Sequence, residues 1–462
     1  MAEISVVNVS QLQQSGRLDP EPYGRAFFIN EEALDSLSQK APVIKLKSII
    51  SQPVITGHTP KIREPNLDGT DALFVKTDIL RKGFIRKEKA DLISDEGFQK
   101  IKRASLKKDD VIVTIIGATY EIIGRAALIF DDLGKACINQ NIALIRSNLK
   151  YPGFLLSFIN SKYGYYQLCR LSRQTEQVNL NCREVEELRI PLFSEKMQKQ
   201  IHELVTKAHE ELTNSVRIYT QAERMLLEEL GLKDVRLKYD LSYAANLLKA
   251  FEAHRIDAEH FQPAYDEVTK KVLNFQNGYT QLSNYAKNVN PDFDPSDFPV
   301  KTFSYVELAN IDPSIGVIDS VSEVKGEEAP SRARRVLRKD DVIVSSVEGS
   351  LEKVALVDKE HEGSLASTGF FQLRPRKIHP EVLLVLSKSI VLQAQLKKEC
   401  AGTILTAVPK DSLKRIVVPI IPNETQEKIV LIVQQSHEAR RKAKGLLETA
   451  KRQVEETIEK AR

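Results

Sequence analysis

The chain has 462 residues, enough for roughly two to four domains of ordinary size. Hydrophobic residues make up 42% and charged residues 28% of it, a composition typical of folded, water-soluble proteins. No apolar run is long enough to span a membrane, and the first residues lack the pattern of a signal peptide, so we expect a cytoplasmic protein. The net charge of +4 is small, and any affinity for nucleic acid must therefore come from local patches.

An internal repeat organises the whole chain. The segment LKKDDVIV at 106–113 returns as LRKDDVIV at 337–344 with one Lys-to-Arg change, and RLDPE at 17–21 corresponds to RIDAE at 255–259. A shift of 228 residues then superposes further identical residues: Arg146 on Arg374, Pro152 on Pro380, Gln167 on Gln395 and Gln198 on Gln426. A unit of roughly 200 residues is too long for a solenoid repeat and indicates a duplicated domain with an appendage.

Each copy is predicted to contain strands followed by helices. Short runs rich in β-branched residues, separated by turns, predict strands at 111–116, 126–130 and 142–146, and again at 342–347, 353–357 and 370–374. Pro152 and Pro380 precede segments with helical spacing. Between the matched anchors the copies have diverged, most of all in 50–105 against 285–336. We expect one mixed α/β scaffold that carries two different surfaces.

A long helix is predicted after each mixed α/β segment. From Glu195 to Leu230 apolar residues recur in steps of three and four without proline or glycine until Gly231, and 424–462 repeats this pattern. Such helices would be about 54 to 58 Å long. A lone helix with one apolar stripe is unstable in water, so we expect the two to pack on one another, with Ala and Ser on the seam. The alternative is that each helix folds back on its own domain.

Motifs for catalysis are missing from the sequence. There is no phosphate-binding GxxxxGK[ST], no GxGxxG, no GxSxG, no HExxH and no Asn-Pro-Pro-aromatic segment. Four scattered cysteines, predicted to be buried or idle thiols, form no CxxC pair: Cys137, Cys169, Cys182 and Cys400. We therefore expect no metal, no cofactor and no catalytic residue in this chain.

The repeated carboxylate pairs Asp109-Asp110 and Asp340-Asp341 are the most tempting catalytic candidates. Adjacent residues at the start of a strand point to opposite faces, so the two carboxylates of a pair cannot easily converge on one substrate. A role in the turn or at the start of the strand is the better interpretation. We expect His58 and His361 to be solvated loop residues.

In its order of parts the chain resembles the DNA-specificity subunits of type I restriction-modification systems. The shared features are RIDAEHF at 255, the turn Gly57-His58-Thr59-Pro60, the Lys-Asp-Asp strand, the Ile-Pro-Leu edge and the Gln-x-x-Ile helix start at Gln198 and Gln426. The second copy has no Gly-x-Thr-Pro, and the first copy opens with RLDPEPY.

The resemblance implies an α+β fold in which two similar target recognition domains are each followed by a long helix, the two helices packing as an antiparallel coiled coil. We expect the first recognition domain with its N-terminal extension at 1–190, the first spacer helix at 191–232, a linker at 233–254, the second recognition domain at 255–418 and the second spacer helix at 419–462.

The resemblance also implies a function. Each recognition domain would read one half of a bipartite, asymmetric site in double-stranded DNA, and the spacer would fix the distance between the halves. Two methyltransferase subunits would dock on this frame, bring S-adenosylmethionine and methylate adenine, and restriction subunits would join them. The alternative is a non-catalytic helical scaffold, or another DNA-binding assembly protein, without a restriction role.

Polar loop residues are the candidates for contact with DNA. Amides suit the readout of adenine edges and basic side chains suit phosphates, although such runs can also be solvated faces. In the first copy the candidates are Thr59, Lys61, Arg63, Thr119, Tyr120, Arg125, Asn139, Gln140 and Asn141. In the second copy they are Glu348, Ser350 and Lys353, with Arg332, Arg334 and Arg335 from a basic run that continues to Arg338 and Lys339.

Overall fold

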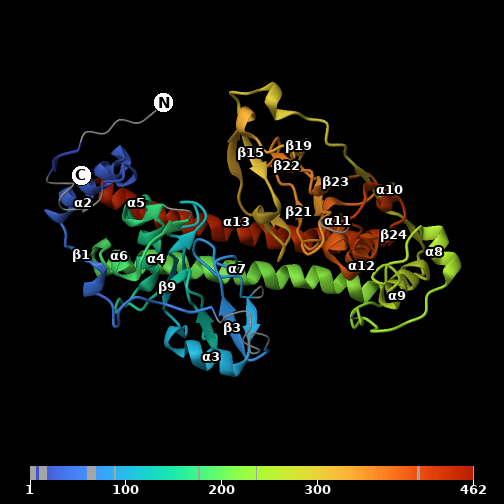
Figure 1. The fold of residues 1–462 in the computed structure, drawn as a ribbon, viewed down its shortest axis with the longest axis horizontal. Helices are drawn as coiled ribbons and strands as arrows, with labels where there is room; N and C mark the ends of the chain where they lie inside the picture. Colours follow the sequence, from blue (N-terminus) through green and yellow to red (C-terminus); the bar gives the residue numbers. More distant parts are fainter. Residues whose placement is uncertain are drawn as a thin grey trace. The chain divides into compact units, whose positions relative to one another are not determined.

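The computed structural model describes residues 7–9, 18–59, 69–87, 90–174, 177–235, 237–402 and 406–460. The chain divides into two compact units: unit 1 comprises 1–211 and 441–462, and unit 2 comprises 212–440 (Figure 1). Each unit combines short strands with helices, which confirms the predicted mixed α/β fold of both copies.

Unit 1 contains four small sheets in its described part. They have the strand orders β2-β9-β5-β7, β4-β3-β8, β10-β11-β6 and β1-β12. All strand pairs are antiparallel except β3 with β8, which run parallel. The strands are β1 (Val43–Lys45), β2 (Ile55–Thr56), β3 (Ala72–Val75), β4 (Asp91–Ile93), β5 (Val111–Thr114), β6 (Ile116–Gly117), β7 (Ala126–Leu128), β8 (Ala136–Ile138), β9 (Ile142–Ile145), β10 (Arg173–Gln174), β11 (Val178–Asn179) and β12 (Arg189–Pro191).

The helices of unit 1 begin where local capping chemistry allows. Pro152 occupies the start of α4, where its missing N–H costs no hydrogen bond. The Ser161 hydroxyl accepts a hydrogen bond from the backbone N of Gly164 and caps α5. The helices are α2 (Arg25–Ser38), α3 (Asp95–Ile101), α4 (Pro152–Asn160), α5 (Lys162–Leu171) and α6 (Cys182–Glu186), with 3-10 turns at Glu21–Tyr23, Leu46–Ser48 and Lys102–Ala104.

Unit 2 has sheets of order β14-β23-β20-β21-β17-β16, β18-β15-β22-β19 and β13-β24. The pair β15 and β22 is parallel, as its counterpart β3 and β8 is in unit 1. The strands are β13 (Tyr279–Gln281), β14 (Ala286–Asn288), β15 (Thr302–Val306), β16 (Ile311–Asp312), β17 (Val317–Ile318), β18 (Ser322–Lys325), β19 (Ala333–Val336), β20 (Val342–Ser345), β21 (Val354–Leu356), β22 (Leu365–Ser367), β23 (Phe370–Pro375) and β24 (Val417–Pro419).

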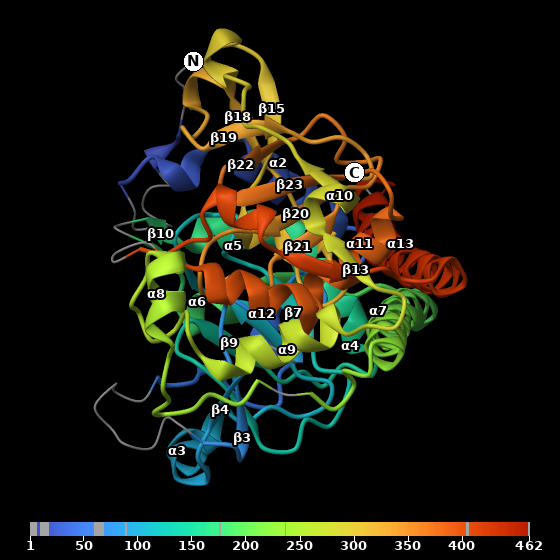
Figure 2. The ribbon, with the colours of Figure 1, turned by 90° about the vertical axis from the view of Figure 1, so that its right-hand side faces the viewer.

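Helices cover the sheets of unit 2 as they do in unit 1. Helix α11 packs on β20 and β21, and α12 packs on α11 and α9 (Figure 2). The helices are α8 (Leu247–Ala253), α9 (Pro263–Leu273), α10 (Leu282–Tyr285), α11 (Pro380–Lys388) and α12 (Ile390–Glu399), with 3-10 turns at Pro295–Asp297, Leu308–Asn310, Gly326–Glu328 and Lys410–Lys414.

The residues that recur in both copies hold the scaffold together. Arg146 donates two hydrogen bonds of 2.7 Å to the buried carboxylate of Asp110, and Arg374 donates two of 2.8 Å to Asp341. Asp109 has a φ of 71° and Asp340 a φ of 70°, so the first aspartate of each pair forms the turn and only the second enters the core. The structural interpretation of both pairs is confirmed.

The recurring glutamines act in the same way. The Gln167 side chain donates to the carbonyl of Arg189 at 3.2 Å and accepts from its N–H at 2.8 Å, and Gln395 makes the same two bonds with Val417. In unit 1 these bonds join α5 to the edge strand β12. In unit 2 they join α12 to the edge strand β24. Identity between the copies therefore marks structural hydrogen bonds.

The long helices α7 (Glu195–Glu229) and α13 (Asn423–Lys460) are antiparallel in each unit. In unit 1 Glu211 pairs with Lys442, and the Thr457 hydroxyl lies 3.6 Å from the sulfur of Met197. In unit 2 the buried Ser436 hydroxyl donates to the carbonyl of Ser215 at 2.8 Å. Early residues of α7 meet late residues of α13, which confirms the predicted pairing.

The long helices also pack on the cores of the units. The alternative, in which each helix folds back on its own domain, is therefore correct in part. Ile201 and Val205 of α7 join the core of unit 1 together with Val454 and Ile458 of α13. In unit 2 Tyr219 and Leu226 of α7 are core residues, as are Ile429 and Val433 of α13. Each helix thus shares its apolar stripe between its partner helix and the sheet-bearing part of both units.

One further expectation differs from the structure. His361 is only 6% exposed, and its Nδ1 lies 2.6 Å from a carboxylate oxygen of Asp358, so the expectation of a solvated loop residue is wrong. The stretch 233–254, expected to be a linker, contains α8, and its residues Val235 and Leu237 pack on the buried cluster that α9 and α12 form. His58, by contrast, is exposed as expected.

Candidate nucleic-acid interface

Three loop segments of unit 1 meet at one edge of its sheets. The backbone N of Gly57 donates to the carbonyl of Asn139 at 3.2 Å, and that of Ile115 donates to the carbonyl of Asn141 at 2.9 Å. The Thr59 hydroxyl donates to the side-chain oxygen of Gln140. The structure therefore brings together candidates that lie far apart in the sequence.

The three clustered amides of unit 1 have different roles. Asn139 is 6% exposed, and its side-chain oxygen accepts a hydrogen bond of 3.2 Å from the backbone N of Asn141, so it shapes the turn. Gln140 is exposed and Asn141 is half-buried. Gln140 is the amide best placed to meet a base edge. Lys61 and Arg63 lie outside the described residues.

The remaining candidates of unit 1 lie on the loop between β5 and β7. Thr119 is exposed, whereas Tyr120 and Arg125 are half-buried. The Tyr165 hydroxyl of α5 donates to the carbonyl of Tyr120 at 3.3 Å, and the Arg125 Nε donates to the carbonyl of Glu121 at 3.1 Å. This end of the loop is therefore held against α5, while its other end, at Ile115, joins Asn141.

The three arginines at and near β19 in unit 2 are in different environments. Arg332 is exposed, and Arg334 forms an ion pair with Asp294. Arg335 is 5% exposed, donates to the carbonyl of Val289, and burial lowers its pKa to about 10. Arg332 is thus the arginine most open to a phosphate, and Arg335 supports the strand.

The hairpin candidates of unit 2 lie on the loop between β20 and β21. Glu348 is exposed, whereas Ser350 and Lys353 are half-buried. The Ser350 hydroxyl lies 3.0 Å from that of Ser345 and donates to the carbonyl of Val347 at 3.0 Å. Glu348 is therefore the most accessible of the three, and its negative charge suits a cytosine amino group better than a phosphate.

Sequence reasoning missed the turn 367–369 of unit 2. The backbone N of Thr368 donates to the carbonyl of Arg332 at 2.8 Å, and that of Ser346 donates to the carbonyl of Gly369 at 2.9 Å. The Ser367 hydroxyl accepts from the backbone N of Gly369 at 3.1 Å, just as Asn139 accepts from Asn141. The shift of 228 residues, which maps 139–141 onto 367–369, is the signal that would have found it.

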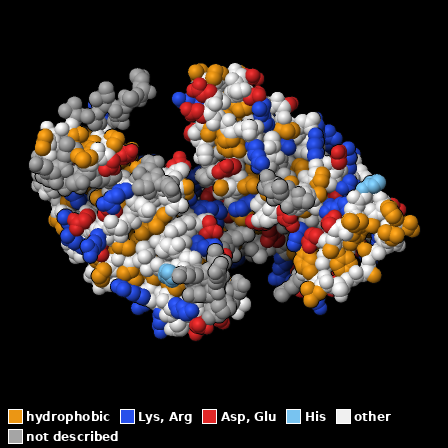
Figure 3. All heavy atoms as spheres, in the orientation of Figure 1, with side chains coloured by type: hydrophobic (Ala, Val, Ile, Leu, Met, Phe, Trp, Pro, Cys, Tyr) orange, Lys and Arg blue, Asp and Glu red, His pale blue; other side chains and the backbone are white. Residues whose placement is uncertain are grey.

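Charges of both signs are scattered over the visible surface. In Figure 3 the Lys and Arg side chains are interspersed with Asp and Glu. Within the described part of the chain there is no group of three or more His, Cys, Asp or Glu residues that could hold a metal ion. No helix in that part is both long and apolar enough to cross a membrane.

These observations first define a class of protein: a duplicated α/β chain whose two copies carry loops of different chemistry on one scaffold. Residues 40–224 match the family model described as the type I restriction modification DNA specificity domain. This part of the chain therefore matches the DNA-specificity domain of type I restriction-modification systems, in agreement with the resemblance seen in the sequence.

The solved structures that the chain matches include two specificity subunits. The S subunit of a type I restriction-modification system from M. genitalium is 14% identical, with 91% of this chain and 95% of that chain covered and a TM-score of 0.38. The HsdS subunit from Thermoanaerobacter tengcongensis is 18% identical, with 91% and 95% covered and a TM-score of 0.28.

Proposed function

We propose that this chain is the DNA-specificity subunit of a type I restriction-modification complex and that each unit reads one half of a bipartite, asymmetric site. The observation that carries the proposal is the turn shared by both units. In each unit the side-chain oxygen of the first turn residue, Asn139 or Ser367, accepts a hydrogen bond from the backbone N–H two residues on, yet the residue between them is Gln140 in unit 1 and Thr368 in unit 2. Equal scaffolds with different side chains at the reading position fit an asymmetric target.

The chemistry of each turn indicates what it reads. The Gln140 amide can donate and accept at once, as the N6 and N7 edge of adenine requires. Thr368 offers one hydroxyl and a methyl group, which suit a single hydrogen bond or contact with a thymine methyl. Arg332, whose carbonyl accepts from the N–H of Thr368, is close enough to the turn to bind an adjacent phosphate.

The long helices supply the spacer in this proposal. Each of α7 and α13 begins in one unit and ends in the other, because the units divide at Glu211 and Arg440. A helix pair is stiff compared with a flexible linker. It would fix the distance between half-sites and offer a frame for two methyltransferase subunits. Those subunits would bring S-adenosylmethionine, and restriction subunits would join for cleavage, while this chain would contribute no catalytic group.

Two single substitutions test whether each unit reads its own half-site. In the complex with its methyltransferase, we expect Gln140→Ala to relax specificity by about 1 to 3 kcal/mol at one position of one half-site. Thr368→Ala is the matched control, and it should relax only the other half-site. Binding to a library of duplexes measures both.

Relaxation of the same half-site by both variants would contradict the proposal. Binding of duplex DNA that does not depend on salt, or no binding by the assembled complex, would favour a scaffold without a DNA role.

A further inference from the structure

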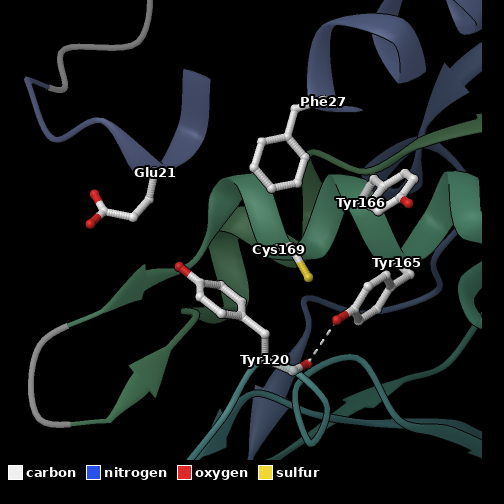
Figure 4. A pocket seen from close by; sticks show the side chains of 6 residues that line it. All are labelled: Glu21, Phe27, Tyr120, Tyr165, Tyr166 and Cys169. Carbon is white, nitrogen blue, oxygen red and sulfur yellow. Dashed lines mark hydrogen bonds between the residues drawn. The ribbon is translucent and has the colours of Figure 1, made fainter. Parts of the chain in front are cut away.

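Unit 1 contains an aromatic cavity that includes one candidate for contact with DNA, Tyr120, but not Gln140, the residue proposed to read a base. It has a volume of about 280 Å³ and is lined by Glu21, Phe27, Tyr120, Tyr165, Tyr166 and Cys169. Figure 4 shows the aromatic rings grouped around the Cys169 sulfur of α5, with Glu21 at the margin and its carboxylate directed away from Cys169, so that this side chain would have to turn toward a bound cation. Aromatic rings beside a carboxylate form a typical surrounding for an organic cation.

Unit 2 shows what fills the equivalent place. The repeat places Glu21 on Glu259 and Phe27 on Tyr265 with a shift of 238, and Cys169 on Lys397 with a shift of 228. The helices agree, since α2 and α9 start at equivalent residues, as do α5 and α12. The cavity of unit 1 therefore corresponds to the surroundings of Lys397.

Lys397 is a cation in an aromatic and acidic site. Its Nζ lies 4.6 Å from the ring centre of Tyr239, donates to the Tyr239 hydroxyl at 3.0 Å, and lies 3.8 Å from a carboxylate oxygen of Glu259. These hydrogen bonds and charges raise the pKa of Lys397. In unit 2 the cation in this aromatic and acidic site is thus supplied by the chain itself, as the Lys397 side chain.

Unit 1 has similar surroundings, but among its described residues no cation takes the place of Lys397. Tyr166 meets Phe27 edge-on with ring centres 6.0 Å apart, much as Tyr239 meets Tyr265 at 5.9 Å. Cys169 takes the position of Lys397 and is 5% exposed. Burial raises its pKa to about 11, so the thiol stays neutral. Among the described residues, the Glu21 carboxylate has no ion-pair partner.

We propose that this cavity binds the guanidinium or ammonium group of an arginine or lysine side chain from a partner polypeptide. The rings of Phe27, Tyr120, Tyr165 and Tyr166 would surround the cation, and Glu21 would balance its charge. Lys82 is a competing cation, with its Nζ 5.8 Å from the ring centre of Tyr165, but it does not line the cavity. The methyltransferase as that partner rests on the proposed function, whereas the cation site does not.

Small cations test the site on the full chain without DNA or partners. Propylguanidinium and butylammonium are titrated against propylurea, a neutral molecule of similar shape, with binding followed by saturation-transfer NMR. Cation–π attraction and one carboxylate predict at least about tenfold weaker binding of the urea. Equal binding of urea and cations would overturn the proposal, and so would binding of adenosine in preference to both, because the cavity would then accept a base.

Single substitutions test whether the small cations bind in the aromatic cavity of unit 1. Cys169→Lys restores the internal cation of unit 2 and should abolish binding of propylguanidinium, and Glu21→Gln should weaken it by about tenfold. Glu96→Gln, on α3, is the charge-matched control and should have no effect. Lys397→Cys should create a second site in unit 2, which provides a gain-of-binding test even where Cys169→Lys disturbs packing. Unchanged binding in Glu21→Gln and Lys397→Cys would overturn the proposal.

In the complex, the same variants identify the partner. Loss of methyltransferase assembly in Cys169→Lys with DNA half-sites unchanged would assign the cation to that subunit. Normal assembly would assign it to another polypeptide and leave the proposed function intact.

Discussion

Single residues show why identity between the copies is structural. Asp110 is 1% exposed, and besides its two bonds from Arg146 it accepts one of 2.7 Å from the backbone N of Lys107. Asp341 accepts equivalent bonds from Arg374 and from the backbone N of Arg338. The turn, the strand and the neighbouring strand are thus joined by one buried carboxylate in each unit.

Removal of the Asp110 carboxylate should lower the stability of unit 1. We expect Asp110→Ala to lower the free energy of unfolding of unit 1 by about 3 kcal/mol, because it leaves Arg146 partly buried without its partner. Urea denaturation measures the change. Asp109→Asn is the matched control: asparagine tolerates the left-handed φ of this position, so its effect should stay within about 0.5 kcal/mol. Equal effects of the two substitutions would show that the ion pair does not stabilise the turn.

Elements could be predicted from the sequence where periodicity and repetition agree. The strands at Val111 and Val342 and the helices that begin at Pro152 and Pro380 lie where the sequence predicts them, because buried β-branched runs and proline positions are local signals. The long helices α7 and α13 were predicted from a stripe that continues over many turns.

Other features of the fold depend on contacts that a single sequence does not reveal. Asp110 and Arg146 are separated by 36 positions, and both recur in the second copy, but recurrence alone does not say that they touch. The environment of His361 depends on Asp358 and on burial. The residues of the turn differ between the copies, so the turn at Thr368 could be found only by mapping one copy on the other.

The helix α7 provides a prediction at the scale of elements. Tyr219 is fully buried, its ring lies 4.1 Å from the Nζ of Lys388 on α11, and its hydroxyl has no hydrogen-bond partner among the described residues. Tyr219→Phe keeps the ring and removes an unsatisfied polar group. We expect unchanged stability or a gain of up to about 1 kcal/mol in urea denaturation.

Tyr219→Ala is the comparison, and it should lose about 3 to 5 kcal/mol because it leaves a cavity. A clear loss in Tyr219→Phe would mean that the hydroxyl has a partner.

The whole molecule provides a prediction about the spacer. We propose to insert seven residues after Glu211 and seven after Arg440, where the units divide. A heptad nearly preserves the face of each helix and lengthens the pair by about 10 Å. This equals about three base pairs, so the non-specific gap of the target should lengthen while both half-sites keep their sequence.

The control inserts the same heptad after Gly134, a turn glycine with open space around it. That insertion should leave the gap unchanged. An unchanged gap after lengthening the helices, with DNA binding intact, would show that the helices do not set the distance.

The most direct test of two independent readers is the methylome of cells that express this chain with its methyltransferase. Residues 50–150, which contain the loops of unit 1 that we propose to read DNA, are exchanged for those of a related subunit. Since unit 2 keeps its own turn at Thr368, the account predicts a bipartite methylated motif in which one half changes while the other half and the gap stay the same. A change in both halves, or an undivided motif, would contradict it.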